Sequence, residues 1–183
     1  LSLLRDTVRV AIIGARDSSE AGVRRAQKLA SLLAREGVVV VSGLAMGIDH
    51  AAHRGSMAAK GGRTIAVIGT PLDKAYPQEH AALQEEIYRD HLLVSQFAPG
   101  SQVFPSNFVK RNRTMALLSH ATVIIEAGDG SGTLSQAAET VRLGRPLFIA
   151  QSVLANPELE WPTRFIGKGA QVLERAEQIL DAV

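Results

Sequence analysis

The run of four valines from Val38 to Val41 limits the possible folds of this chain more than any other feature. Such a β-branched run is typical of a strand that is buried on both faces. A short glycine-containing turn and a helical segment follow. Gly43 and Gly47 allow the backbone to adopt positive φ or to approach a ligand closely. Backbone N–H groups at a strand–turn–helix junction form an anion site, which the helix dipole strengthens. The stretch predicts a phosphate-bearing ligand at the carboxyl edge of a parallel sheet, although a tight turn without a ligand is an open alternative.

Apolar runs and amphipathic stretches alternate along the chain. This alternation predicts an α/β fold with a doubly wound, mostly parallel sheet and helices on both faces. We expect one domain over residues 1–183, in which residues 151–183 are an irregular segment followed by a terminal helix. The expected strands are Val8–Ile13, Val38–Val41, Thr64–Ile68, Leu92–Ser95, Thr122–Ile125 and Pro146–Ile149, and the expected helices are Glu20–Glu36, Ile48–Ala59, Pro77–Asp90, Asn107–His120, Thr133–Leu143 and Val172–Ala182.

Composition limits the class of protein. With 183 residues, 46% of them hydrophobic and 21% charged, the chain is long and apolar enough to bury a substantial core. The sequence contains no cysteine, which excludes disulfides and cysteine-based zinc sites. No apolar run has the length of a membrane span and the start does not read as a signal peptide, so we expect a cytoplasmic protein without a membrane partner. A net charge of +2 does not indicate nucleic-acid binding by itself, so such a function needs a local basic cluster.

A basic cluster of this kind occurs at residues 107–113, which carry three positive charges and no acid. On a helix, Asn107, Lys110 and Arg113 follow an i, i+3 spacing and are expected to share one face, where the cations neutralise phosphates. Phe108 is expected to stack on a base, as aromatic side chains do with single strands. The alternative is a solvated basic face with Phe108 in the core.

Two further strand ends carry anion-binding residues. Arg16 follows the first strand, and its guanidinium fork suits a phosphate, although a surface ion pair with Asp17 is the alternative. The loop Gly130–Thr133 opens a helix and is expected to cradle phosphate, or else to be a capping turn only. Glu126 lies beside this loop and is expected either near the ligand or orienting Arg111, which has the alternative of a structural ion pair inside the domain.

Catalytic and metal chemistry find less support. Asp49, His50 and His53 include two histidines at i, i+3 spacing and an acid, but a third well-placed metal ligand is not evident. Ser42 follows a strand, yet no Ser–His–Asp arrangement supports a nucleophile. We therefore predict no metal site and no catalytic residue.

Taken together, these segments resemble the DNA-processing protein A family (DprA, also called Smf), a branch of the Rossmann-like SLOG superfamily. The resemblance extends from about Val8 to Ala150 and implies an extended Rossmann-like fold. It also implies a homodimer that binds and protects single-stranded DNA and helps to load a RecA-type recombinase during natural transformation. The matching motifs are Val10–Arg16, Ser42–Asp49 with Ala52–Gly55, Thr64–Thr70 with Leu72-Asp73 and Tyr76-Pro77, and Asn107-Phe108 with Arg111–Arg113.

One loop departs from this family and leaves two alternatives. Residues 128–133 are similar to the Gly-Gly-x-Gly-Thr loop of lysine-decarboxylase-like (LOG) nucleotide phosphoribohydrolases, in which a following acidic pair carries the chemistry. Ser135 and Gln136 stand at those positions here, so a hydrolase is the second alternative, after a SLOG-type sensor of a small nucleotide. We expect no cofactor other than a bound nucleotide or phosphate. The predicted DNA- and phosphate-binding residues are Arg16, Ser42, Gly43, Gly47, Asn107, Phe108, Lys110, Arg111, Arg113, Gly130, Ser131, Gly132 and Thr133.

Overall fold

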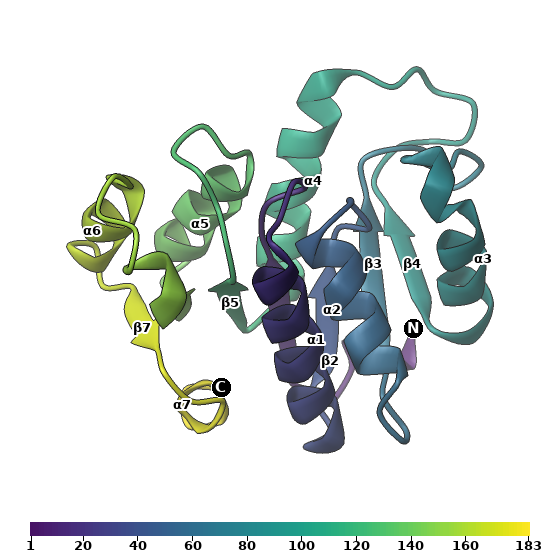
Figure 1. The fold of residues 1–183 in the computed structure, drawn as a ribbon. Helices are drawn as coiled ribbons and strands as arrows, with labels where there is room; N and C mark the ends of the chain where they lie inside the picture. Colours follow the sequence, from purple (N-terminus) through teal and green to yellow (C-terminus); the bar gives the residue numbers. More distant parts are fainter.

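Seven parallel strands form one sheet in the computed structural model, which describes residues 1–183 (Figure 1). The strand order is β4-β3-β2-β1-β5-β6-β7. A fully parallel sheet has both faces covered, which explains why the five inner strands are runs of mostly buried apolar residues. The strands are β1 (Arg9–Ile13), β2 (Val39–Ser42), β3 (Thr64–Ile68), β4 (Leu92–Ser95), β5 (Ala121–Ile124), β6 (Leu147–Ala150) and β7 (Gln171–Leu173).

Seven α-helices and three short 3-10 helices connect the strands. None of the helices combines the length and the apolar character needed to cross a lipid bilayer. The α-helices are α1 (Glu20–Arg35), α2 (Ile48–Met57), α3 (Ala81–Asp90), α4 (Pro105–Leu118), α5 (Thr133–Arg142), α6 (Trp161–Ile166) and α7 (Glu177–Leu180), and the 3-10 helices are Ser2–Leu4, Gln78–His80 and Gln151–Val153.

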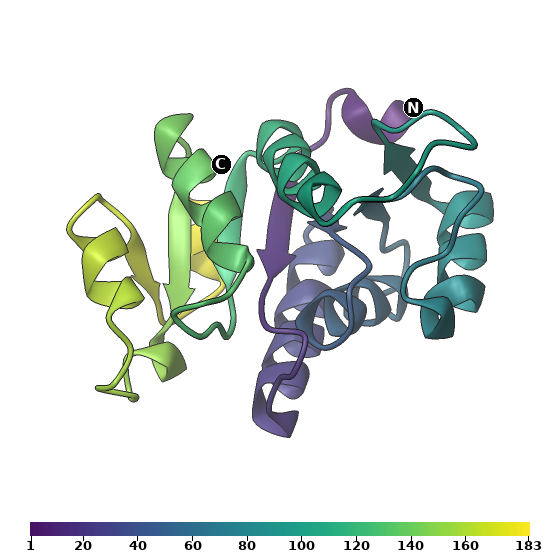
Figure 2. The same ribbon diagram turned by 90° about the horizontal axis from the view of Figure 1, so that it is seen from above.

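The helices pack in two layers, one on each face of the sheet (Figure 2). On one face, α1, α2 and α7 bury Leu33, Ala51 and Ile179 against strand residues such as Val40. On the other face, α4, α5 and α6 bury side chains that include Met115, Ala137 and Trp161 against the opposite sides of the same strands. A third, smaller cluster joins Leu83 and Ile87 of α3 to Ile68 of β3. The side chains that alternate along the strands therefore point into cores on opposite faces of the sheet.

The strand order reverses between β1 and β5, and this reversal positions the site. The chain first runs outward from β1 to β4 and then returns through α4 to place β5 on the free side of β1. The loops that leave the carboxyl ends of β1 and β5 diverge at such a point and leave a crevice between them, where ligands of doubly wound sheets bind. In this chain the two loops are residues 14–19 and 125–132.

The end of the chain differs from the prediction. The terminal helix predicted over Val172–Ala182 is wrong: a seventh strand pairs Phe148 of β6 with Gln171, and only the short α7 follows it. Part of the segment expected to be irregular forms α6, in which Trp161 and Phe165 are buried one turn apart. A three-residue strand gives too little alternation to be recognised in the sequence, since the pairing with β6 determines it.

Candidate functional site

The turn after β2 uses its own backbone donors internally. Asp49 accepts hydrogen bonds from the backbone N–H groups of Gly43 (3.1 Å) and Ala45 (3.4 Å). Burial raises the pKa of Asp49, and the nearby positive charge of Arg111 opposes that rise. Leu44, between the two donors, has a φ of 61°, an uncommon left-handed conformation for a non-glycine residue. The N–H groups of Gly43 and Ala45 are therefore occupied by a buried carboxylate, whereas the phosphate contact of this turn stays a prediction.

Ser42 and Gly47 shape this region without facing a ligand. Ser42 is fully buried, and its hydroxyl donates to the carbonyl of Ile12 at 2.7 Å. Gly47 has a φ of 73°, and a Cβ atom there would collide with the carbonyl oxygens of Ala15 and Arg16. The two residues therefore hold the β1 and β2 loops together, a structural role that replaces the predicted contact.

Arg111 fastens α4 to the ends of two strands. Its side chain is buried, and Nη1 donates to the carbonyl oxygens of Gly43 and of Val67, the latter at 2.9 Å. Nε donates to Oδ1 of Asn112 at 3.0 Å. Burial lowers the pKa of this guanidinium, and Asp49 partly restores it. The side chain is thus held inside the domain by two carbonyls and an amide, while its Nη2 has no protein partner.

Phe108 and Tyr76 form an aromatic platform beside Arg16. Their ring centroids are 5.2 Å apart, and the guanidinium carbon of Arg16 lies 5.6 Å from the Phe108 centroid. Phe108 lies so close over Gly69 that a Cβ atom on Gly69 would be 2.7 Å from the ring. Phe108 is only partly buried and Tyr76 is 49% exposed, so the platform retains surface that a ligand can cover.

The loop before α5 is tied to β1 and to α4. The Thr133 hydroxyl donates to the carbonyl of Gly14 at 3.1 Å, and Asn112 Nδ2 donates to the carbonyl of Gly132 at 3.0 Å. The Ser131 hydroxyl accepts from the backbone N–H of Thr133 at 3.2 Å. The N–H group of Gly132 has no protein partner and stands at the positive end of the α5 dipole. The loop is therefore a rigid edge with a free donor for an anion.

These features border one cleft at the switch point between β1 and β5. The cleft has a volume of about 480 Å³, within the range of small-molecule sites. A smaller recess adjoins it and adds Gly43, Gly69 and Tyr76 to the lining. Among the predicted site residues, the cleft and recess bring together Arg16, Gly43, Phe108, Arg111, Ser131, Gly132 and Thr133.

The predicted cationic face of α4 is not continuous with this cleft. Asn107 is buried, whereas Lys110 and Arg113 are exposed and do not line the cleft. Arg113 instead pairs with Glu139 of α5 at 3.2 Å. The buried stripe of α4 passes through residues 107, 111, 112 and 115, so Asn107 shares a face with Arg111 and not with the cations. Gly130 also lies outside the lining, in open surroundings.

Glu126 and His53 have structural roles. The Glu126 carboxylate accepts hydrogen bonds from the backbone N–H of Ser19 at 3.0 Å and from the Ser19 hydroxyl at 2.8 Å, which fixes the start of α1. It was predicted to lie near the ligand or to orient Arg111, and it does neither here. His53 is fully buried, its Nδ1 lies 2.8 Å from the Thr64 hydroxyl, and burial lowers its pKa to about 3. A neutral, packed imidazole in this position supports the strand beneath it.

Tyr76 and Gln136 were not among the predicted binding residues. Tyr76, which belongs to one of the motifs that matched the family, reaches the platform from the loop after β3. Gln136 lies on α5, lines the cleft and is 1% exposed, with neither side-chain amide atom hydrogen-bonded. Its position after the glycine loop was noted in the sequence only as the replacement of an acid.

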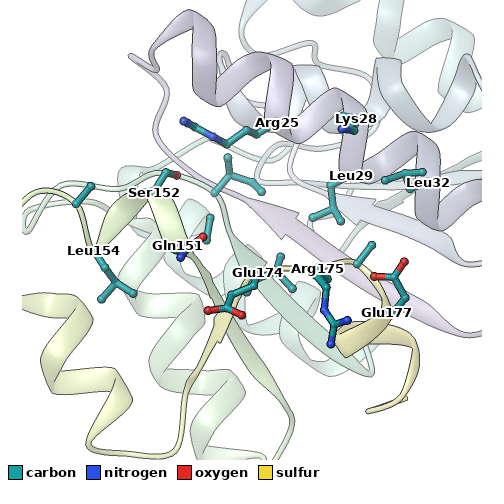
Figure 3. Close-up of a pocket in the computed structure, with 15 residues that line it drawn as sticks. Arg25, Lys28, Leu29, Leu32, Gln151, Ser152, Leu154, Glu174, Arg175 and Glu177 are labelled. Atoms are coloured by element: carbon teal, nitrogen blue, oxygen red, sulfur yellow. The ribbon is translucent and has the colours of Figure 1, made fainter.

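A second, larger cavity lies beside α1. This groove of about 980 Å³ runs between α1 and residues 173–177 (Figure 3). Leu29 and Leu32 contribute apolar surface, while charges of both signs, such as Lys28 and Glu177, line it. A groove of mixed charge lacks the uniformly positive surface that favours phosphates, and none of the predicted site residues lines it.

Comparisons with known proteins agree with one another. The whole chain, residues 1–183, matches the family described as DNA recombination-mediator protein A. It is 36% identical over 172 residues to a DNA processing protein DprA of Streptococcus pneumoniae, covering 94% of this chain and 60% of that protein. The chain therefore spans less than two thirds of this relative. An X-ray structure of DprA from the same organism superimposes with a TM-score of 0.89 and 35% identity, covering 98% of this chain and 62% of that one.

A second solved structure is informative about binding. DNA processing protein A from Helicobacter pylori, reported for its single-stranded DNA binding mode, has a TM-score of 0.86 and 30% identity to this chain. The match covers 98% of this chain and 81% of that one. The cleft described above therefore lies in a fold shared with a protein whose binding mode for single-stranded DNA has been studied.

Proposed function

We propose that this chain, which belongs to the DNA recombination-mediator protein A family, binds single-stranded DNA through the cleft between the β1 and β5 loops. It acts as a binding protein and not as an enzyme. The relatives support this reading, because the H. pylori protein is described as binding single-stranded DNA.

The observation that carries the proposal is the meeting of phosphate donors and an aromatic platform in one place. Arg16 and the free N–H group of Gly132 are suited to phosphate oxygens. Phe108 and Tyr76 offer ring faces to a base. Single strands are held without sequence preference by this combination of positive groups and stacking surfaces.

The exposed cations of α4 extend the proposed path of the strand. Lys110 and Arg113 lie outside the cleft on the same helix as Phe108, so a strand that leaves the platform passes close to them. In the Arg113–Glu139 pair, the arginine side chain is 65% exposed to solvent. Exposed ion pairs contribute little to stability, so Arg113 can exchange its carboxylate for a phosphate at small cost.

Family membership supports three further parts of the proposal. We propose that the protein is a homodimer, that it delivers single-stranded DNA to a RecA-type recombinase, and that it works in the cytoplasm during DNA uptake. Light scattering of the purified protein tests the dimer. Recombinase filament formation on protein-coated DNA, compared with naked DNA, tests the delivery.

The direct test is fluorescence anisotropy of a labelled oligo-dT at several salt concentrations. We expect binding that weakens steeply with salt, since each neutralised phosphate adds about −0.7 to the slope of log K against log salt for a single strand. Binding that is absent at low salt would overturn the proposal. Binding that is insensitive to salt would show that phosphates are not the contacted groups.

A small-nucleotide sensor is the second candidate, because the cleft has the volume of a small-molecule site. This candidate predicts that AMP or a cyclic dinucleotide raises the melting temperature while oligo-dT does not bind. Hydrolysis is not proposed. The Ser135 hydroxyl donates to the Gly132 carbonyl at 2.7 Å, and the Gln136 side chain is an amide, so neither position carries a carboxylate for hydrolysis. Release of a free base from a nucleoside monophosphate would contradict the absence of hydrolysis.

A further inference from the structure

The loop before α5 consists of two halves that are held by different parts of the molecule. Its second half, residues 131–133, lines the cleft and is tied to α4 and to the loop after β1. Its first half is a turn, which the backbone N–H group of Ser131 closes by donating to the carbonyl of Gly128 at 3.0 Å. Asp129 and Gly130 are the two central residues of this turn. Whatever holds the turn therefore also helps to place the edge of the cleft.

Asp129 connects this turn to the C-terminal part of the chain. Its Oδ1 accepts hydrogen bonds from the backbone N–H groups of Glu160 (3.2 Å) and Trp161 (2.9 Å), the residues at which α6 begins. The indole N–H group of Trp161 donates in turn to the carbonyl of Ala127 at 2.9 Å. The first N–H groups of a helix have no partner within the helix, and an aspartate satisfies them well. The turn and α6 thus hold each other at two neighbouring residues of the loop.

The glycines of the loop add no packing to this attachment. A Cβ atom on Gly128, Gly130 or Gly132 would meet nothing within 4 Å. Glycine has more conformational freedom than any other residue, so a loop of this composition loses much entropy when it becomes ordered. Asp129 has the only side chain in the first half of the loop, and its carboxylate therefore supplies the attachment that the glycines lack.

The helix α6 is a firm support for this attachment. Trp161 is fully buried and Phe165 almost fully buried, and both belong to the apolar cluster that also contains Ala137 of α5 (Figure 1). No residue of α6 lines the cleft, so this helix does not contact a ligand bound there. Its effect on the cleft therefore passes through Asp129 and the turn.

We propose that Asp129 is a positioning residue, which sets the phosphate-binding edge of the cleft against α6. The inference rests on the proposed binding of single-stranded DNA and assigns a part in that binding to the C-terminal segment around α6. With the attachment in place, the loop is ordered before a strand arrives. Without it, the binding step must also order the loop, and the affinity falls.

The test measures the affinity for oligo-dT of the wild type and of three variants by fluorescence anisotropy. Asp129→Ala should bind on the order of tenfold more weakly, because the loss of a helix cap moves the cost of ordering the loop into the binding step. Asp129→Asn keeps an acceptor oxygen for the start of α6 and should retain most of the affinity. Asp181→Ala is the matched control, since it removes an exposed carboxylate outside the loop and should not lower the affinity.

The direction of the change separates positioning from charge. Removal of a carboxylate near a bound strand reduces repulsion of its phosphates, so charge alone predicts tighter binding in all three variants. Weaker binding in Asp129→Ala, together with rescue in Asp129→Asn, is the opposite pattern. Affinity of Asp129→Ala equal to or above that of the wild type would overturn the inference. An equal loss in both Asp129 variants would also overturn it, because the acceptor oxygen would then have no part.

Trp161 provides a second readout, because it is the single tryptophan of the chain. It is fully buried and lies outside the cleft lining, so a bound strand does not touch it. We expect acrylamide to quench its emission more strongly in Asp129→Ala than in the wild type, and saturating oligo-dT to reverse this increase. A purely structural role of Asp129 predicts the increase without the reversal, and that result would overturn the inference.

The outcomes for the proposed function and for this inference are distinct. If oligo-dT binds the wild type and Asp129→Ala equally well, the inference fails and the proposed function stands. If AMP binds the wild type and oligo-dT does not, the proposed function fails, and the same comparison of variants with AMP decides the inference. If neither ligand binds the wild type, both fail.

Discussion

Replacing Arg111 by methionine should strongly destabilise the protein. The change removes the hydrogen bonds that the buried guanidinium gives to the carbonyls of Gly43 and Val67 and to Asn112. It also removes the positive charge that opposes the pKa rise of buried Asp49. Removing one partner from a buried charged arrangement costs about 3–5 kcal/mol. For a domain of this size the melting temperature should fall by roughly 6–20 °C.

The stability lost in Arg111→Met should depend on pH. Burial raises the pKa of Asp49, so the folded state holds a proton more readily than the unfolded chain. Between the unfolded and the folded pKa of this group, the free energy of unfolding therefore falls as pH rises. Without Arg111 the folded pKa of Asp49 rises further, which extends this window to higher pH. We expect the difference between wild type and variant to be larger at neutral than at acidic pH.

Urea unfolding at several pH values measures both effects. Lys110→Met is the matched control, because it removes a cation next to Arg111 on the same helix but from an exposed position. Its effect should stay within about 0.5 kcal/mol. An Arg111→Met variant as stable as this control, or equally destabilised at every pH, would refute the reasoning about the buried guanidinium.

Two further predictions concern the cleft. Arg16→Ala should weaken binding to oligo-dT and reduce the magnitude of the salt slope by about 0.7 if one phosphate contact is lost; Arg35→Ala, at the opposite end of α1, should change neither quantity. Gly69→Ala places a methyl group 2.7 Å from the Phe108 ring and should displace it, so that affinity for oligo-dT falls while the fold persists. Gly128→Ala, where a Cβ meets nothing within 4 Å, is its control, and equal affinities of the two variants would contradict the platform.

The sequence predicted the location of the site better than its contacts. Glycine and hydroxyl residues after several strands indicated the carboxyl edge of the sheet, and the structure brings Arg16, Phe108 and the loop before α5 together there. The N–H groups of the β2–α2 turn were assigned to an external phosphate because sequence spacing does not reveal that Asp49 folds back to accept from them. Gly47 has the positive φ that the sequence allowed for, and the N–H group of Gly43 has an internal partner in Asp49.

The sequence pattern did not predict which face of α4 is buried, nor the hydrogen-bond partners of single side chains. Spacing of i, i+3 grouped Asn107 with Lys110 and Arg113, but the helix is anchored by Arg111 and Asn112, and that rotation turns Asn107 inward. Arg111 was expected to bind DNA or to form an ion pair, and it is held chiefly by two backbone carbonyls, one just after β2 and one in β3. Such partners come from segments distant in the sequence, so no local pattern encodes them.

The place of β5 in the sheet has a consequence for folding during synthesis. β5 pairs with β1, which lies more than a hundred residues earlier in the chain, and the loop before α5 bonds to Gly14. A ribosome that has delivered only β1 to β4 therefore leaves one edge of β1 unpaired and half of the cleft absent. Such an exposed edge is prone to pair with other chains. The cleft is therefore complete only after the chain has been synthesised past the loop before α5.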